Sequence, residues 1–157
     1  LIRAEPSALG QMVEVFEHYN SSVLAVQEVP RSETRHYGVV KGRAWEAGIH
    51  KLDGIVEKPL PEEAPSNLGV VGRYILTPRI FKYLESLQAG SGGEIQLTDA
   101  IARLLEKEQV LAYEFKGKRY DCGSKLGYLE ATVEYALEHA DLNESFRAYL
   151  RKLKLPG

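Results

Sequence analysis

The stretch LGVVGRYIL at residues 68–76 is the clearest strand that the sequence predicts, an apolar run with Gly69 and Gly72 inside it. A helical pattern through Leu87 follows, with Pro78 suited to its first position and Thr77 to its cap. Strand and helix patterns alternate on both sides of this unit. The sequence therefore predicts an α/β layer fold.

Apolar spacing places the other elements. Helices are expected at residues 9–19, 97–105 and 126–137, and the first of them should begin near Ser7. Asp141 with Glu144 resembles a capping box for a last helix. Further strands are expected at residues 23–29, 37–40, 49–56, 110–115 and 119–122. The remaining stretches are expected to be irregular: a polar loop at 31–36, a turn region with a weak strand at 42–48, and loops at 60–66 and 90–93.

Composition excludes several classes of protein. The chain has 157 residues, 20 Lys and Arg against 22 Asp and Glu, and a net charge of -2, which argues against a nucleic-acid-binding protein. A single cysteine excludes an internal disulfide and a cysteine-based structural zinc site. No apolar run approaches ~20 residues, and no signal peptide is visible. We expect one domain over residues 1–157, cytoplasmic and without a membrane partner.

Glu57-Lys58-Pro59 lies where a predicted strand ends. The carboxylate could accept hydrogen bonds from sugar hydroxyls, and the ammonium could neutralise a phosphate. Neighbouring residues of a regular strand point to opposite faces, so both can touch one ligand only if the ligand lies across the strand end or the backbone twists there. A solvated strand end is the alternative.

Two glycine-containing stretches could approach a ligand closely. Gly38 follows Tyr37 at the start of a strand, where glycine marks either close approach by a ligand or a bulge. The glycine run at residues 90–93 precedes Glu94, Thr98 and Asp99 at a helix start but lacks the known phosphate-loop patterns. The acidic residues there would repel phosphate, so a neutral sugar is the better ligand and a mobile linker the alternative.

The segment at residues 116–125 gathers cations, glycines and Asp121 at a turn from strand to helix. A carboxylate is a suitable Mg²⁺ ligand when substrate phosphates supply the rest. The alternative is a surface turn in which Asp121 caps the next helix. Cys122 is expected to be a small buried residue.

Four of these stretches follow one another in an order that resembles the bacterial UTP–glucose-1-phosphate uridylyltransferases, a family of sugar nucleotidyltransferases. The resemblance runs over nearly the whole chain and rests on VEKP at 56–59, APSNL at 64–68 with GRY at 72–74, GEIQLTDAI at 93–101 and YDCGSKLGY at 120–128. It implies a Rossmann-like mixed sheet with flanking helices, and transfer of UMP from UTP to glucose 1-phosphate with Mg²⁺ to give UDP-glucose and pyrophosphate.

Carried over by position, the resemblance assigns site residues. Glu57 would hold glucose hydroxyls, Lys58 the sugar phosphate, and Asp121 the metal, while Gly38 would let the backbone approach the sugar. Lys58 and Asp121 would thus be the catalytic residues. Glu94, Thr98 and Asp99 match the family motif and would line or support the sugar pocket.

The family's glycine-rich nucleotide loop, its uracil-reading segment and its other metal aspartate do not occur in this sequence. The chain thus resembles the sugar-binding C-terminal half of the enzyme without its N-terminal nucleotide-binding half, and we expect it to be inactive alone. A non-catalytic sugar-phosphate-binding or regulatory module, and another hexose-1-phosphate nucleotidyltransferase, are the alternatives. A sheet without half of its neighbours exposes strand edges and apolar faces, so we also expect a homo-oligomer.

Overall fold

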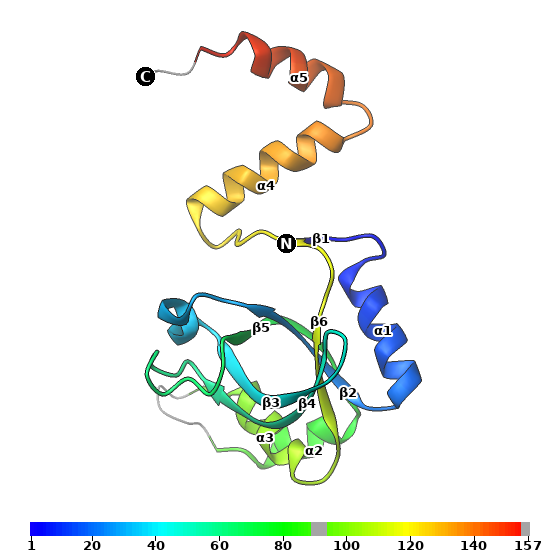
Figure 1. Ribbon diagram of the computed structural model, residues 1–157, viewed down its shortest axis with the longest axis vertical. Coiled ribbons are helices and arrows are strands. Elements are labelled where there is room, and N and C mark those ends of the chain that lie inside the picture. The colour runs from blue at the N-terminus through cyan, green and yellow to red at the C-terminus, as the bar shows by residue number, and fades with distance from the viewer. Residues whose placement is uncertain (89–93, 155–157) are drawn as a thin grey trace. The chain divides into compact units, whose positions relative to one another are not determined.

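The computed structural model describes residues 1–88 and 94–154 (Figure 1). The chain forms two compact units. The larger unit comprises residues 5–116, and the smaller unit combines residues 1–4 with the segment from Gly117 onward. The expected single domain over residues 1–157 stays a prediction.

A mixed five-stranded sheet forms the centre of the larger unit. Its strands, in spatial order, are β2 (Ser22–Glu28), β5 (Leu68–Ile75), β3 (Gly38–Glu46), β4 (Ile49–Glu57) and β6 (Val110–Glu114). β6 pairs in parallel with β2, so the row of strands closes on itself, while the other pairs are antiparallel. The expected α/β mixed sheet with flanking helices is confirmed.

Helices cover the sheet because alternate strand residues point to opposite faces. On one face α1 (Ala8–Tyr19) packs Met12 and Val15 against Val23, Ala25 and Leu111. On the other, α2 (Arg79–Ser86) and α3 (Leu97–Leu105) pack Ile80, Ile101 and Leu104 against Leu24, Val26, Val40 and Val70. The packing of α2 and α3 on this second face fixes the position of α3, which carries Thr98.

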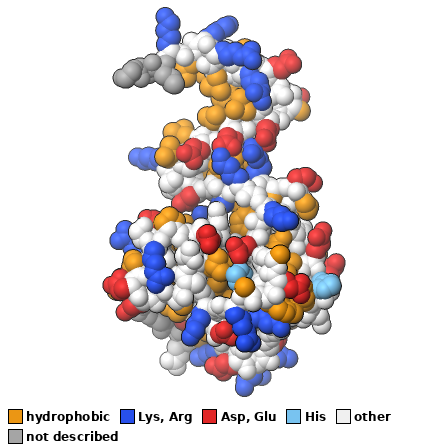
Figure 2. Space-filling view, viewed as in Figure 1, with side chains coloured by type: hydrophobic (Ala, Val, Ile, Leu, Met, Phe, Trp, Pro, Cys, Tyr) orange, Lys and Arg blue, Asp and Glu red, His pale blue; other side chains and the backbone are white. Residues whose placement is uncertain are grey.

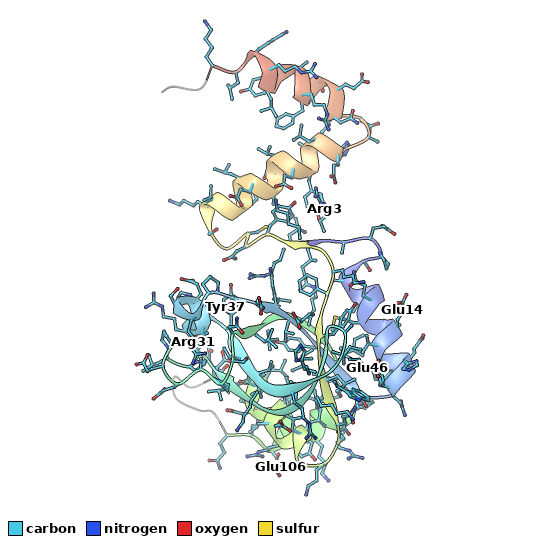
Figure 3. All side chains as sticks on the ribbon, viewed as in Figure 1. Arg3, Glu14, Arg31, Tyr37, Glu46 and Glu106 are labelled. Atoms are coloured by element: carbon cyan, nitrogen blue, oxygen red, sulfur yellow. The ribbon has the colours of Figure 1, made fainter. Side chains whose placement is uncertain are left out.

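The smaller unit contains β1 (Ile2–Arg3), paired antiparallel with β7 (Lys118–Arg119), followed by α4 (Lys125–Glu138) and α5 (Asn143–Lys152). Arg3, labelled in Figure 3, donates a 2.8 Å hydrogen bond from Nη1 to Glu138 of α4. Among the described residues, the helices are too short or too polar to cross a lipid bilayer.

Glu134 of α4 ties this helix to β7 and to the residue after it. Its carboxylate accepts hydrogen bonds from Lys118 and from the Tyr120 hydroxyl, the latter at 2.7 Å. The Lys118 and Tyr120 hydrogen bonds lower the pKa of Glu134. Burial first, and then the Glu134 hydrogen bond, raises the pKa of Tyr120 to about 12. The folded unit therefore favours a protonated phenol beside an ionised carboxylate.

This pair predicts how stability depends on pH. Because the pKa of Tyr120 is raised on folding, its contribution is complete below pH 10 and is lost as the pH rises from 10 through about 12. Tyr120→Phe should therefore lose less stability than the original chain between these pH values. Urea unfolding of both proteins at pH 9 and at pH 11.5 measures the difference; identical losses would contradict the proposed role of the phenol.

The expected elements are largely confirmed, with several differences. β7 covers Lys118–Arg119 rather than residues 119–122, and Pro78 precedes α2 rather than being its first residue. Residues 31–36 form a 3-10 helix, η1 (Arg31–His36), rather than a loop. At 42–48, where a turn region with a weak strand was expected, β3 continues through Glu46. Thr77 does not cap α2, since its hydroxyl donates to Glu108 at 2.6 Å instead. Asp141 is not the cap of α5, which starts after Leu142 without a side-chain cap. The expected loop at 90–93 lies outside the described residues.

Candidate functional site

Lys58 adopts a left-handed backbone conformation directly after β4 ends at Glu57. Its φ is 46°, which a residue with a Cβ atom rarely adopts and which costs about 1–2 kcal/mol. The Lys58 N–H donates to the carbonyl of Tyr37 at 2.9 Å, which holds this turn (Figure 3 labels Tyr37). Strained positions of this kind cluster at functional sites.

The turn brings the two charged groups together. Lys58 Nζ lies 3.8 Å from Glu57 Oε1, whereas consecutive side chains of a regular strand would point to opposite faces. The Lys58 side chain is 59% exposed and that of Glu57 28%. The backbone twist that one shared ligand would require is therefore present, and both groups are accessible to it.

Gly38 lies opposite Glu57 in the pairing of β3 with β4. A Cβ atom on Gly38 would lie 3.0 Å from Thr98 Cγ2 and 3.2 Å from Glu57 Oε2. Both contacts are tighter than ordinary van der Waals distances. The glycine therefore lets a strand residue, a strand-end carboxylate and the first turn of α3 meet at one point.

Thr98 contributes a buried hydroxyl to this place. Its residue is 7% exposed, and Thr98 Oγ1 has no hydrogen-bond partner within the described part of the chain. Burying an unpaired hydroxyl costs about 1–3 kcal/mol, so such a group in a folded protein requires an explanation. The Thr98 atom that faces Gly38 is the methyl carbon Cγ2.

Tyr74 on β5 is a neighbour of Glu57 that the sequence analysis did not single out as a site residue. Burial raises the pKa of Tyr74, and the negative charge of Glu57 raises it further. Its phenol is therefore neutral at physiological pH and within electrostatic reach of the carboxylate. The signal available in the sequence was the GRY motif at 72–74, one of the segments that carry the family resemblance.

The two acidic residues near the start of α3 are not brought to Gly38 and Glu57 by any described contact. Glu94 is exposed, and its carboxylate accepts a long 3.5 Å hydrogen bond from Gln96. Asp99 lines a separate recess of about 580 Å³ with Ser86, Arg103 and neighbouring residues of α2 and α3. Of the expected site residues in the larger unit, the structure thus gathers Gly38, Glu57, Lys58 and Thr98.

Asp121, the remaining expected site residue, lies in the smaller unit, in the turn between β7 and α4. It is exposed, and its Oδ1 accepts a 3.1 Å hydrogen bond from the Gly123 N–H. The helix cap is Ser124, whose Oγ accepts from the Gly127 N–H at 3.0 Å, so Asp121 is not the cap. Cys122 is exposed, so the expectation that it is buried is wrong.

Gly127 supports the Asp121 turn and was not identified from the sequence. A Cβ atom there would lie 2.3 Å from the Asp121 carbonyl oxygen and 2.9 Å from its carbonyl carbon. Those atoms belong to the backbone and cannot rotate away. Gly127 thus permits the chain at Asp121 to fold back closely over the first turn of α4.

Comparison with known proteins gives the family. The nucleotidyl transferase family model matches residues 1–138. A UTP–glucose-1-phosphate uridylyltransferase of Staphylococcus epidermidis is 46% identical, with 99% of this chain and 54% of the relative covered. The Bacillus subtilis protein of the same name is 44% identical, with 98% and 52% covered.

A solved structure of UDP-glucose pyrophosphorylase complexed with UDP-glucose shares the fold with a TM-score of 0.83 at 45% identity, over 88% of this chain and 53% of that one. The chain spans about half the length of the curated relatives it matches. These matches confirm the resemblance drawn from the sequence motifs: the chain belongs to the nucleotidyl transferase family.

Proposed function

We propose that this chain provides the glucose 1-phosphate site of a UTP–glucose-1-phosphate uridylyltransferase. The reaction transfers UMP from UTP to glucose 1-phosphate and gives UDP-glucose and pyrophosphate. The observation that carries the proposal is the left-handed turn at Lys58, which sets an ammonium beside the Glu57 carboxylate next to Gly38. One group suits a phosphate and the other suits hydroxyls, and a sugar phosphate carries both.

Each gathered residue has a distinct role in this proposal. The Glu57 carboxylate accepts hydrogen bonds from the sugar, and Gly38 leaves the room that this carboxylate and Thr98 occupy beside the strand. Thr98 supports this place from α3, with its methyl carbon Cγ2 against Gly38. Lys58 neutralises the phosphate, which lowers its repulsion from the anionic nucleotide.

The proposed chemistry needs no protein nucleophile. An oxygen of the sugar phosphate attacks the α-phosphorus of UTP; the new oxygen–phosphorus bond forms as the bond to the pyrophosphate leaving group breaks. Positioning and charge neutralisation then account for most of the catalysis. Lys58 contributes to both, because it fixes the phosphate and offsets its charge.

We also propose Mg²⁺ as the cofactor, with Asp121 as its ligand in this chain. The described residues contain no group of three or more histidine, cysteine or acidic residues suited to a metal. Mg²⁺ fits this donor set, because it is commonly held by one or two carboxylates while substrate phosphates and water fill the remaining positions. When bound, the ion would offset the charge that develops on the phosphates.

Calorimetry on the purified chain tests the sugar-phosphate site. We expect glucose 1-phosphate to bind, and glucose or inorganic phosphate alone to bind at least about tenfold more weakly, because each engages only one of the two charged groups. Equal affinity for inorganic phosphate would contradict the proposal, because it would mean that an exposed positive charge alone binds the phosphate and that the sugar adds nothing.

The same chain is expected to have negligible uridylyltransferase activity by itself. Its 157 residues contain none of the known glycine-rich patterns that hold nucleotide phosphates. A coupled assay for pyrophosphate release from UTP and glucose 1-phosphate measures this directly. Robust turnover would contradict the assignment of the chain to the sugar side of the reaction.

Cytoplasmic location, and uridine rather than another base, stay predictions.

A further inference from the structure

One residue of η1 is buried although charged residues of the same helix face solvent. Thr34 is fully buried, whereas Arg31 and Arg35 are exposed. Figure 2 shows charged side chains of both signs over the surface of the larger unit. A buried hydroxyl costs free energy unless it is hydrogen-bonded, so the partners of Thr34 indicate what this helix holds in place.

The Thr34 hydroxyl reaches the residue that follows Lys58. Thr34 Oγ1 lies 3.3 Å from the Pro59 carbonyl oxygen and 3.0 Å from the Arg31 carbonyl oxygen, and its proton can be donated to either. The Arg31 contact lies within η1, but the Pro59 contact is buried and joins residues 25 positions apart. Loss of the hydroxyl would therefore take a donor from a polar group in the interior.

Thr34 and the Lys58 turn form a closed ring of hydrogen bonds. The Tyr37 N–H donates to the Thr34 carbonyl at 3.0 Å, and the Lys58 N–H donates to the Tyr37 carbonyl at 2.9 Å. The Thr34 hydroxyl closes the ring at Pro59. Lys58 is thus held at its own amide and at the residue after it. A strained φ of 46° persists only where surrounding contacts impose it, and this ring supplies such contacts.

The loop that leaves this turn is also anchored. Arg31 Nη2 donates to the Ala64 carbonyl at 2.8 Å, and Ser66 Oγ donates to the Val40 carbonyl at 2.6 Å (Figure 3 labels Arg31). Ala64 and Ser66 belong to the APSNL motif at 64–68, which the proposed sugar-phosphate site left without a role. Contacts from η1 and from β3 therefore limit the freedom of the chain beyond the turn.

We propose that Thr34 is a positioning residue of the sugar-phosphate site, because its hydroxyl fixes the turn that directs the Lys58 ammonium toward the phosphate. This role rests on the proposed function of the site. Thr34 is fully buried, so it acts through Lys58 rather than on the substrate. A turn that is fixed before the ligand arrives loses less freedom on binding, which increases affinity.

NMR of the ligand-free, isotope-labelled chain tests the positioning directly. A residue with positive φ gives a strong NOE between its own amide and Hα protons, so this signal of Lys58 reports the turn. Thr34→Val replaces the hydroxyl with a methyl group and should weaken the NOE, whereas Thr34→Ser keeps the hydroxyl and should preserve it. Equal weakening in both variants would overturn the proposal, because the methyl group rather than the hydroxyl would then hold the turn.

Calorimetry with glucose 1-phosphate tests the consequence for binding. Thr34→Val should weaken binding about three- to tenfold, the range expected for one neutral hydrogen bond, and Thr34→Ser less than about twofold. In a Lys58→Ala background, Thr34→Val should weaken binding less than about twofold further, because no ammonium remains to be positioned. The full loss in that background would overturn the proposal, since Thr34 would then act independently of Lys58.

Thr77→Val is the matched control. It also removes a threonine hydroxyl with a distant partner, Glu108, to which Thr77 donates at 2.6 Å. Thr77 follows the end of β5, whereas the site lies at the start of β5, where Gly69 pairs with Val39. The control should lower the temperature of thermal unfolding but leave the Lys58 NOE and the affinity unchanged. Equal loss of affinity in Thr77→Val and Thr34→Val would overturn the proposal, because general destabilisation would explain both.

A second pair of variants serves if Thr34→Val does not fold because its added methyl group meets two carbonyl oxygens. Thr34→Ala and Thr34→Ser both lose the threonine methyl group, so their difference isolates the hydroxyl. An unchanged Lys58 NOE in Thr34→Ala would overturn the positioning role. By contrast, no binding of glucose 1-phosphate to the original chain, or equal binding to Lys58→Ala, would contradict the proposed function, and the ligand-free NOE would still decide whether Thr34 fixes the turn.

Discussion

Lys58→Ala is expected to weaken binding of glucose 1-phosphate by about 10- to 150-fold. A charge-assisted hydrogen bond contributes about 1.5–3 kcal/mol, and the substitution removes the one that Lys58 would make to the phosphate. Alanine in the left-handed conformation is about as strained as lysine, so the fold should be unaffected. Calorimetry with glucose 1-phosphate measures the loss, and thermal unfolding checks stability.

Lys116→Ala is the matched control for this prediction. Lys116 is an exposed lysine of the same unit, two residues after the end of β6, and has no proposed contact with the ligand. Its substitution should change the affinity less than about twofold. Equal losses for the two variants would mean that the net positive charge of the unit, rather than the turn at Lys58, attracts the phosphate.

The substitution Lys58→Gly distinguishes the effect of the backbone strain at this position on stability from the effect of the lysine charge on binding. Glycine adopts positive φ without the steric cost of a Cβ atom, although it has more freedom to lose on folding. We expect the variant to be at least as stable as the original chain and yet to bind as weakly as Lys58→Ala. A site residue that lowers stability and raises affinity is the pattern expected of strain retained for function.

Gly127→Ala is expected to have the largest effect on stability. The added Cβ atom would lie 2.3 Å from the Asp121 carbonyl oxygen, and neither backbone segment can yield without displacing α4 or the Asp121 turn. Overpacking of this kind costs typically about 1–3 kcal/mol. Hydrogen exchange should show faster opening of α4, and the amide signals of residues 121–124 should shift.

Gly54→Ala serves as the comparison for this substitution. A Cβ atom at Gly54 would meet only Lys41 Cβ, at an ordinary 3.8 Å. It should therefore leave hydrogen exchange in α4 unchanged. Unaltered exchange in Gly127→Ala as well would show that the Asp121 turn does not depend on close packing against α4.

Local sequence patterns predicted most of the helices and strands, because apolar spacing and capping residues within each segment largely determine them. The apolar spacing of residues 9–19 and 97–105 predicted α1 and α3, and Ser7 does cap α1 by accepting from the Gly10 N–H. The prediction that Thr77 caps α2 failed because a distant residue competes for its hydroxyl. Thr77 donates a hydrogen bond to Glu108, 31 positions away, and no local pattern reveals this partner. Polar residues 31–36 form a 3-10 helix that has no distinctive sequence signal.

The candidate site could be predicted only as separate motifs. Adjacent Glu57 and Lys58 suggested a sugar phosphate, but their joint use required a backbone twist that depends on the Tyr37 carbonyl. Thr98 meets Gly38 across 60 positions of sequence because α3 packs on the sheet, and neither residue signals the other. The family resemblance connected these motifs, and the geometry of the larger unit supplies a physical reason for four of the expected site residues.

The central claim is that a sugar phosphate binds between Gly38, the Glu57–Lys58 turn and Thr98. Titration of the isotope-labelled chain with glucose 1-phosphate, followed residue by residue through its amide NMR signals, tests it most directly. We expect the signals of Gly38, Glu57, Lys58 and Thr98 to shift together and to saturate with a single dissociation constant. Saturating shifts confined to other residues, or none at these four, would contradict the claim.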